Sequence, residues 1–221
     1  MNTSVLPVTC LSVLLLSTVT GCSKKDAQTT RASVAVDTLA TQSTEHLLAQ
    51  PEVQKALEGH SPGATDEALD RLARRGWKRL SDEQLFRRVV LRRKILASAD
   101  VTLCAAVVRD KVSHTQMRAA LAQLDATDVE AFFTLKETAA LAEARGQRPP
   151  KVVLQEEFPE AFGALLRTLP PEQAGHLGEL LTGDPSRASD EDVCWAEKTF
   201  LDALLTLQEP YRSTLARAVV Q

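Results

Sequence analysis

Residues 81–108 read SDEQLFRRVVLRRKILASADVTLCAAVV, and this stretch decides the fold class because it predicts two consecutive helices. Ser81 is followed three residues later by Gln84, which is the capping-box pattern of a helix start. Apolar residues then recur at helical spacing up to about Ser98. The first part of the stretch therefore predicts one long helix.

The second helix of this stretch is predicted from Asp100, whose short acidic side chain is favoured at a helix start. The segment that follows, Val101–Val108, is apolar on every side of a helix. A helix without a polar face is expected to be buried all round. We therefore expect a central, fully buried helix with Cys104 in the core.

Helical patterns continue along most of the chain, interrupted by turn residues such as Pro149 and Pro150. The further predicted segments are Pro51–Glu58, Thr65–Gly76, Ser113–Leu124, Thr127–Gly146, Gln155–Thr168, Pro171–Leu181, Ser189–Gln208 and Tyr211–Val220. Thr127 and Glu130 form a second capping-box pattern. Lys151–Leu154 is the one run with strand character, and one strand makes no sheet. No repeat is found, so the prediction is an all-α, irregular single-domain bundle of about seven to nine helices.

The N-terminus differs from the rest of the chain. The first 21 residues contain no charged side chain, and the apolar run Val8–Val19 precedes Gly21 and Cys22. This run is shorter than the roughly 20 residues that a membrane-spanning helix needs, but it fits the core of a secretory signal.

Together with Val19-Thr20-Gly21-Cys22, the apolar run resembles a bacterial lipoprotein signal peptide. The resemblance implies cleavage before Cys22 and acylation of that cysteine, with palmitate among the acyl chains expected. It also implies a protein anchored by lipid in the cell envelope, without spanning the membrane. Ser23 after the cysteine favours the outer membrane, with the protein facing the periplasm.

The sequence divides into three expected regions, of which the resemblance implies the first. Residues 1–21 are the expected signal peptide, and residues 22–44 are the expected lipidated N-terminus and flexible tether. The tether is inferred from its Ser, Thr, Ala and Gln content and its lack of aromatic residues. Residues 45–221 are long enough to form one globular domain with its own core.

Two of the four cysteines would remain in the folded domain after export, because Cys10 leaves with the signal and Cys22 carries lipid. Cys104 and Cys194 are then expected to form a disulfide in the oxidising periplasm. The alternative is a pair of buried, unpaired thiols. A redox-active pair is not expected, because the sequence has no Cys-x-x-Cys.

Charge is concentrated in residues 71–94, which hold ten basic side chains against two acidic ones. This segment has a net charge of +8, and the rest of the chain has −11. Such a molecule can attract an anionic partner. The predicted partner surface consists of Trp195, Arg74, Arg75, Lys78, Arg79, Arg87 and Arg88. Alternatively, the basic side chains pair internally with acids such as Glu156, Glu157, Asp190, Glu191 and Asp192.

Enzyme motifs are incomplete. Gly59-His60-Ser61-Pro62-Gly63 matches the G-x-S-x-G pattern of hydrolases, but Pro62 has no N–H to donate to an oxyanion. We therefore expect this segment to be a loop between two helices. No cofactor motif is found, so no cofactor is expected.

Acidic residues at helical spacing offer two weaker candidate sites. Glu172, His176 and Glu179 share one helix face and could hold a metal, although the same trio is typical of a solvated helix face. Glu156 and Glu160, one turn apart, could form a carboxylate pair. The simpler expectation is helix-surface charge, and hence no catalytic or metal-binding residues.

Three residues depart from the pattern of their helices. Arg93 and Glu197 fall on the apolar sides, so we expect them either to meet or each to find another opposite charge. Trp195 falls on a polar side. It is expected to be covered by Tyr211 and the last helix, or to be exposed as an anchor for a partner.

These patterns favour a non-catalytic lipoprotein that binds another envelope protein. A narrower version is an immunity or inhibitor protein that blocks an envelope toxin or lytic enzyme. The chain could also be an envelope hydrolase with an unrecognised acid and histidine site, or a structural spacer of the outer membrane. Nucleic acid is not an expected partner of an exported domain, and the sequence predicts no particular oligomeric state.

Overall fold

The computed structural model describes residues 24–59, 65–151, 155–183 and 187–220, with side chains described from Ala32 onward. These residues contain helices and no strand, so the all-α prediction is confirmed. The eleven α-helices are α1 (Lys24–Leu48), α2 (Pro51–Ala56), α3 (Thr65–Gly76), α4 (Asp82–Ser98), α5 (Val101–Val108), α6 (His114–Leu121), α7 (Ala126–Ala144), α8 (Glu157–Leu166), α9 (Pro171–Thr182), α10 (Asp190–Thr206) and α11 (Tyr211–Ala218). A short 3-10 helix, η2 (Trp77–Arg79), links α3 to α4.

The capping box predicted at the start of α4 is present, with both of its hydrogen bonds. The backbone N–H of Gln84 donates to Ser81 Oγ at 3.2 Å, and the Ser81 N–H donates back to Gln84 Oε1 at 2.9 Å. Asp100 caps α5 by accepting the Leu103 N–H at 2.8 Å. These contacts satisfy backbone donors that a helix start leaves without internal partners.

The predicted start of α7 is wrong. The helix begins at Ala126, and Asp125, not Thr127, caps it by accepting the Asp128 N–H at 2.8 Å. Aspartate is a better cap than threonine, and it lies two residues earlier. The capping-box pattern of Thr127 and Glu130 therefore falls inside the helix.

The prediction of a flexible tether over residues 22–44 is also wrong where the structure describes this region, because α1 begins at Lys24 and continues into the folded body. Val36 and Leu47 are each 1 % exposed, and Ser43 is 5 % exposed. Helix α1 packs against α6 and α7 through this stripe, which recurs at helical spacing. The average composition of residues 22–44 did not reveal this buried stripe, because the side chains around it are small or polar.

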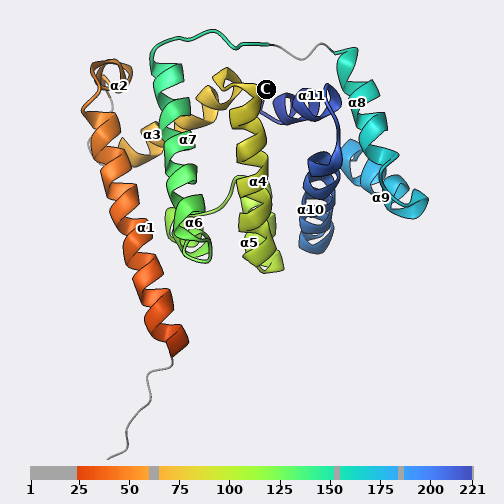
Figure 1. The fold of residues 1–221 in the computed structure, drawn as a ribbon, viewed down its shortest axis with the longest axis horizontal. Helices are drawn as coiled ribbons and strands as arrows, with labels where there is room; N and C mark the ends of the chain where they lie inside the picture. The colour runs from red at the N-terminus through yellow and green to blue at the C-terminus, as the bar shows by residue number, and fades with distance from the viewer. Residues whose placement is uncertain (1–23, 60–64, 152–154, 184–186, 221) are drawn as a thin grey trace, which may run out of the picture.

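Four long helices, α1, α7, α4 and α10, lie side by side in Figure 1, and α8 and α9 lie at the far end beyond α10. Helix α3 packs on α7, α5 on α10, and α11 on both α4 and α8. The largest buried cluster includes Leu85, Leu96, Leu165, Leu201 and Leu204. Helices that are distant in the sequence thus share one core.

Helix α5 is not buried on every side. Cys104 and Ala105 are fully buried on the side that packs against α10, but Val101 is 40 % exposed. Thr102 is exposed as well. The expectation of a fully buried helix is wrong because, among the described elements, only α10 packs extensively against α5, which leaves the rest of its surface partly open.

Candidate functional site

A cavity of about 720 Å³ opens between the N-terminal helices and the middle of the bundle. Side chains of α1, α3, α4, α5, α6 and α7 line it, together with residues between α5 and α6, Trp77 of η2, and Val219 and Val220 after α11. Its volume lies within the roughly 300–1,000 Å³ typical of small-molecule sites. Its apolar lining includes Leu47, Leu69, Leu91, Ile95, Leu121, Phe132, Phe133 and Leu135.

Gly76 helps to shape one wall of this cavity. A Cβ added at Gly76 would lie 1.8 Å from the backbone oxygen of Ala139, so only glycine lets α3 approach α7 this closely. The chain then continues directly into η2, which places the Trp77 ring at the cavity. The cavity wall therefore depends on a backbone contact as well as on side chains.

Most of the charged side chains that line the cavity are paired. Asp70 accepts from Lys136 Nζ at 2.5 Å and lies 3.5 Å from His114 Nδ1. Arg74 lies 3.8 Å from Asp110. These contacts neutralise part of the cavity rim.

Two further lining arginines pair with acids from other helices. Arg92 pairs with Glu197 of α10 at 2.5 Å, and Arg118 pairs with Asp37 of α1 at 3.1 Å. Because Asp37 lies on the segment predicted as a tether, sequence reasoning could not assign it as a partner.

Arg88 differs from these lining arginines. Its guanidinium lies 4.9 Å from the centre of the Trp77 ring, and it makes no ion pair with a described residue. Its side chain is half-buried, with access from the cavity. The pKa of Arg88 is lowered to about 10, chiefly by burial and also by repulsion from Arg92, while the charge of Glu197 partly opposes both effects.

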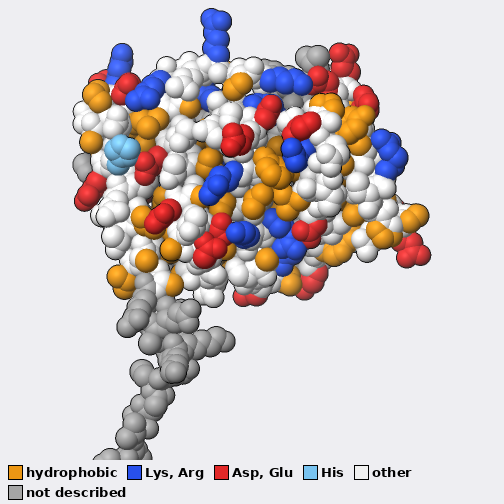
Figure 2. All heavy atoms as spheres, viewed as in Figure 1, with side chains coloured by type: hydrophobic (Ala, Val, Ile, Leu, Met, Phe, Trp, Pro, Cys, Tyr) orange, Lys and Arg blue, Asp and Glu red, His pale blue; other side chains and the backbone are white. Residues whose placement is uncertain are grey.

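The predicted basic surface is less positive than its sequence suggests. Arg75 and Arg79 share Glu143, at 3.6 Å and 2.6 Å. Lys78 and Arg87 make no ion pair within the described part of the chain. Figure 2 shows basic and acidic side chains interspersed on the face in view, with apolar side chains between them.

The acids proposed as internal partners of residues 71–94 are not the ones used in the contacts described above. Asp190 pairs instead with Arg109, which also donates to the Ala188 carbonyl. Lys94 pairs with Asp128. Basic side chains of residues 71–94 do form internal ion pairs. Their partners are other acids, which the crossing of the helices brings close to them.

Trp195 lies in a shallow groove between α9 and α10. Its ring is half-buried and packs on the His176 ring, with 4.7 Å between the centres. The Tyr211 hydroxyl donates instead to Glu160 at 2.7 Å. Helix α9 thus supplies a cover for Trp195 that the sequence did not predict.

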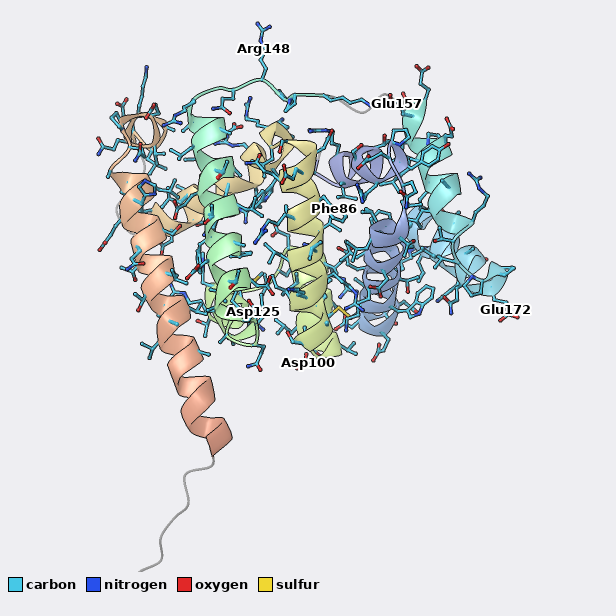
Figure 3. The ribbon with its side chains drawn as sticks, in the orientation of Figure 1. Phe86, Asp100, Asp125, Arg148, Glu157 and Glu172 are labelled. Atoms are coloured by element: carbon cyan, nitrogen blue, oxygen red, sulfur yellow. A yellow bond between two sulfur atoms is a disulfide. The ribbon has the colours of Figure 1, made fainter. Side chains whose placement is uncertain are left out.

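Glu172 and His176 also line this groove, and His176 Nε2 lies 3.6 Å from Asp192 Oδ1. Figure 3 shows Glu172 at the outer end of the molecule, near the start of α9. Among the described residues, no group of three or more His, Cys, Asp or Glu side chains has an arrangement suited to a metal ion.

The two charges on apolar helix faces find separate partners, which was the second of the two expected outcomes. Arg93 donates to both carboxylate oxygens of Asp202, at 2.5 Å and 2.9 Å. Glu197 accepts from Arg92 instead. Helices α4 and α10 are therefore joined by two ion pairs.

The predicted disulfide between Cys104 and Cys194 is confirmed. It joins α5 to α10 with a Cα–Cα distance of 5.5 Å, and both residues are buried. It is drawn in yellow in Figure 3. The bond ties the middle of the chain to its C-terminal part.

Sequence reasoning missed one buried arginine, Arg217, which is 2 % exposed. Its guanidinium donates to the Leu80 carbonyl at 3.1 Å and lies 2.5 Å from Asp82. The position of Arg217 in a short, polar final helix gives no local signal of burial. The contact connects α11 to the start of α4.

The predicted signal segment, including Cys22, lies outside the described residues, as does the stretch from His60 to Gly63. Within the described helices, none combines the length and apolar character needed to cross a membrane. Comparison with family models, curated proteins and solved structures finds no match to this chain.

Proposed function

We propose that this chain is a lipid-anchored protein of the bacterial cell envelope that binds another envelope protein without catalysing a reaction on it. The Cys104–Cys194 disulfide is the observation that carries the proposal. Structural disulfides persist mainly in oxidising compartments, which supports export. The lipobox-like residues Val19–Cys22 supply the route of export and the site of attachment.

The start of α1 two residues after Cys22 supports close attachment to the membrane. If Cys22 carries lipid, α1 would connect the anchor to the body as a helix and not as a loose linker. In Figure 1 the N-terminal end of α1 extends beyond the other helices. The proposed arrangement holds one end of the bundle toward the lipid surface.

Two places remain open to a protein partner. Lys78 is half-buried, and Arg87 is exposed; neither forms an ion pair with the residues described in the structure. Trp195 offers a half-buried aromatic ring in its groove. Arginine and tryptophan are enriched at the centres of interfaces, so Arg87 and Trp195 are the first positions to test.

The anchoring is tested by expressing the full chain in bacteria with an alkyne-labelled palmitate and analysing the purified protein by mass spectrometry. We expect the mature protein to begin at Cys22 and to carry acyl chains. Cys22→Ser is the control and should remain unlabelled. An intact Met1 start, or an unmodified thiol at Cys22, would remove the proposed location.

The partnership is tested with a photo-crosslinking residue at position 87 or 195 in living cells. We expect the same single partner from either position, and its loss after Arg87→Glu. A crosslinker at the exposed residue Thr115 of α6 serves as the control. Identical products from position 115 would show that the contacts are nonspecific.

A further inference from the structure

The cavity described above has a polar side and an apolar side. Its apolar side is formed by buried side chains such as Leu69, Leu121 and Phe133. Its polar side holds Arg88 beside Trp77. A site of this kind suits a ligand that has both a charged end and an apolar end.

The charge of that ligand follows from the pairing of the lining arginines, because Asp66, the lining acid without an ion pair among the described residues, is exposed at the start of α3. The other lining arginines, Arg74, Arg92 and Arg118, each lie within ion-pair distance of a carboxylate. Arg88 is the lining arginine without such a partner in the described part of the molecule. A half-buried guanidinium without a carboxylate in ion-pair contact is costly, so binding of an anion beside it would be favoured.

We propose that this cavity binds a single-chain amphiphile, with an anionic head group against Arg88 and its apolar tail along the α1, α3 and α7 side chains. This inference goes beyond the proposed partnership with a protein and does not depend on lipidation of Cys22. The lowered pKa of Arg88 agrees with it, since an anion would compensate for the burial of the charge. A fatty acid and a single-chain phosphate ester share this chemistry.

The chain provides its own probe, because it has two tryptophans and one of them lines the cavity. In a Trp195→Phe background, Trp77 becomes the sole tryptophan reporter. We would titrate this protein with dodecanoate, dodecyl phosphate, neutral dodecanol and dodecyltrimethylammonium, each below its micelle concentration. Saturable changes in Trp77 fluorescence are expected with the two anions, whose relative affinities distinguish a carboxylate from a phosphate head group.

Arg88→Met and Arg87→Met form a matched pair of variants, because the two residues are adjacent on α4 but only Arg88 lines the cavity. We expect Arg88→Met to weaken dodecanoate binding by roughly tenfold or more, because it removes a charge-assisted hydrogen bond. Arg87→Met should change the affinity by less than about twofold, as expected for an exposed charge that does not line the cavity. Arg88→Lys should recover part of the lost affinity.

The result that would overturn the proposal is equal affinity for dodecanoate and dodecanol, equal effects of the two methionine variants, or no saturable binding of either anion. Circular dichroism of each variant establishes whether the helical fold is retained. If Arg88→Met does not fold, the comparison of head groups on the Trp195→Phe protein still decides the question.

Discussion

At the scale of the residue, Gly76 shows how a missing side chain sets the distance between two helices. The nearest atoms to a Cβ at this position would be the backbone oxygen of Ala139 at 1.8 Å and its carbonyl carbon at 2.5 Å. Backbone atoms cannot turn aside as a flexible side chain can. The close contact between α3 and α7 therefore requires glycine at position 76.

Gly76→Ala is expected to lower the free energy of unfolding by about 2–3 kcal/mol or more, because α3 and α7 must separate to admit the methyl group. Urea denaturation measures this loss. Gly175→Ala is the control, since a Cβ there meets nothing within 4 Å in helix α9. It should stabilise the protein by about 0.5–1 kcal/mol through helix propensity. Equal effects of the two substitutions would contradict this account of Gly76.

At the scale of the element, the start of α7 depends on Asp125. The Asp128 N–H donates to the Asp125 carboxylate, and this hydrogen bond lowers the pKa of Asp125 below its usual value. The charge of Lys94 lowers the pKa further. In Figure 3, Asp125 and Asp100 lie toward the same end of the bundle, each at the start of a helix.

The lowered pKa of Asp125 predicts a specific dependence of stability on pH. Because the folded state binds the proton less readily than the unfolded state, the contribution of the charged cap is present above the unfolded pKa of about 3.9. It is lost as the pH falls through the lower, folded-state pKa. Asp125→Asn should therefore be less stable than the unaltered protein near pH 6, and this difference should shrink below about pH 4. A difference in urea midpoint that stays constant from neutral to acidic pH would contradict the prediction.

The junction of α4 and α10 offers a second test at this scale, because its two ion pairs differ in exposure. The Glu197 side chain is 19 % exposed and the Asp202 side chain is 54 % exposed. Glu197→Gln removes the counter-charge of Arg92, and we expect a loss of about 1.5–3 kcal/mol in unfolding free energy. Asp202→Asn should cost less than about 1 kcal/mol, since water screens this pair. Equal losses in chemical denaturation would show that exposure does not control the two contributions.

At the scale of the whole molecule, the disulfide connects positions 90 residues apart. Closing so long a loop restricts the unfolded chain, and Cys104→Ala combined with Cys194→Ala should lower the free energy of unfolding by about 2–4 kcal/mol. Guanidinium denaturation with and without a reductant measures the effect. The reductant should bring the unaltered protein to the stability of the double variant and leave the double variant unchanged. A double variant as stable as the oxidised protein would show that the bond contributes little.

Much of the helical content could be predicted from local sequence, because the groups that start a helix lie within four residues of one another. Ser81 with Gln84, and Asp100, mark helix starts where the structure has them. Local patterns were less reliable where two caps competed, as at Asp125 and Thr127. The position of the helices around α5, which no local pattern contains, decided that Val101 is exposed.

The sequence by itself determined the all-α class and several helix ends, and it predicted the pairing of Cys104 with Cys194. Only the tertiary structure decided that α1 joins the body, that Glu197 pairs with Arg92, and that Arg88 lines a cavity without a carboxylate partner among the described residues. The physical reason is distance along the chain. A cap or a helical stripe is made by near neighbours, whereas a cavity or a counter-charge is created only when helices from distant segments cross.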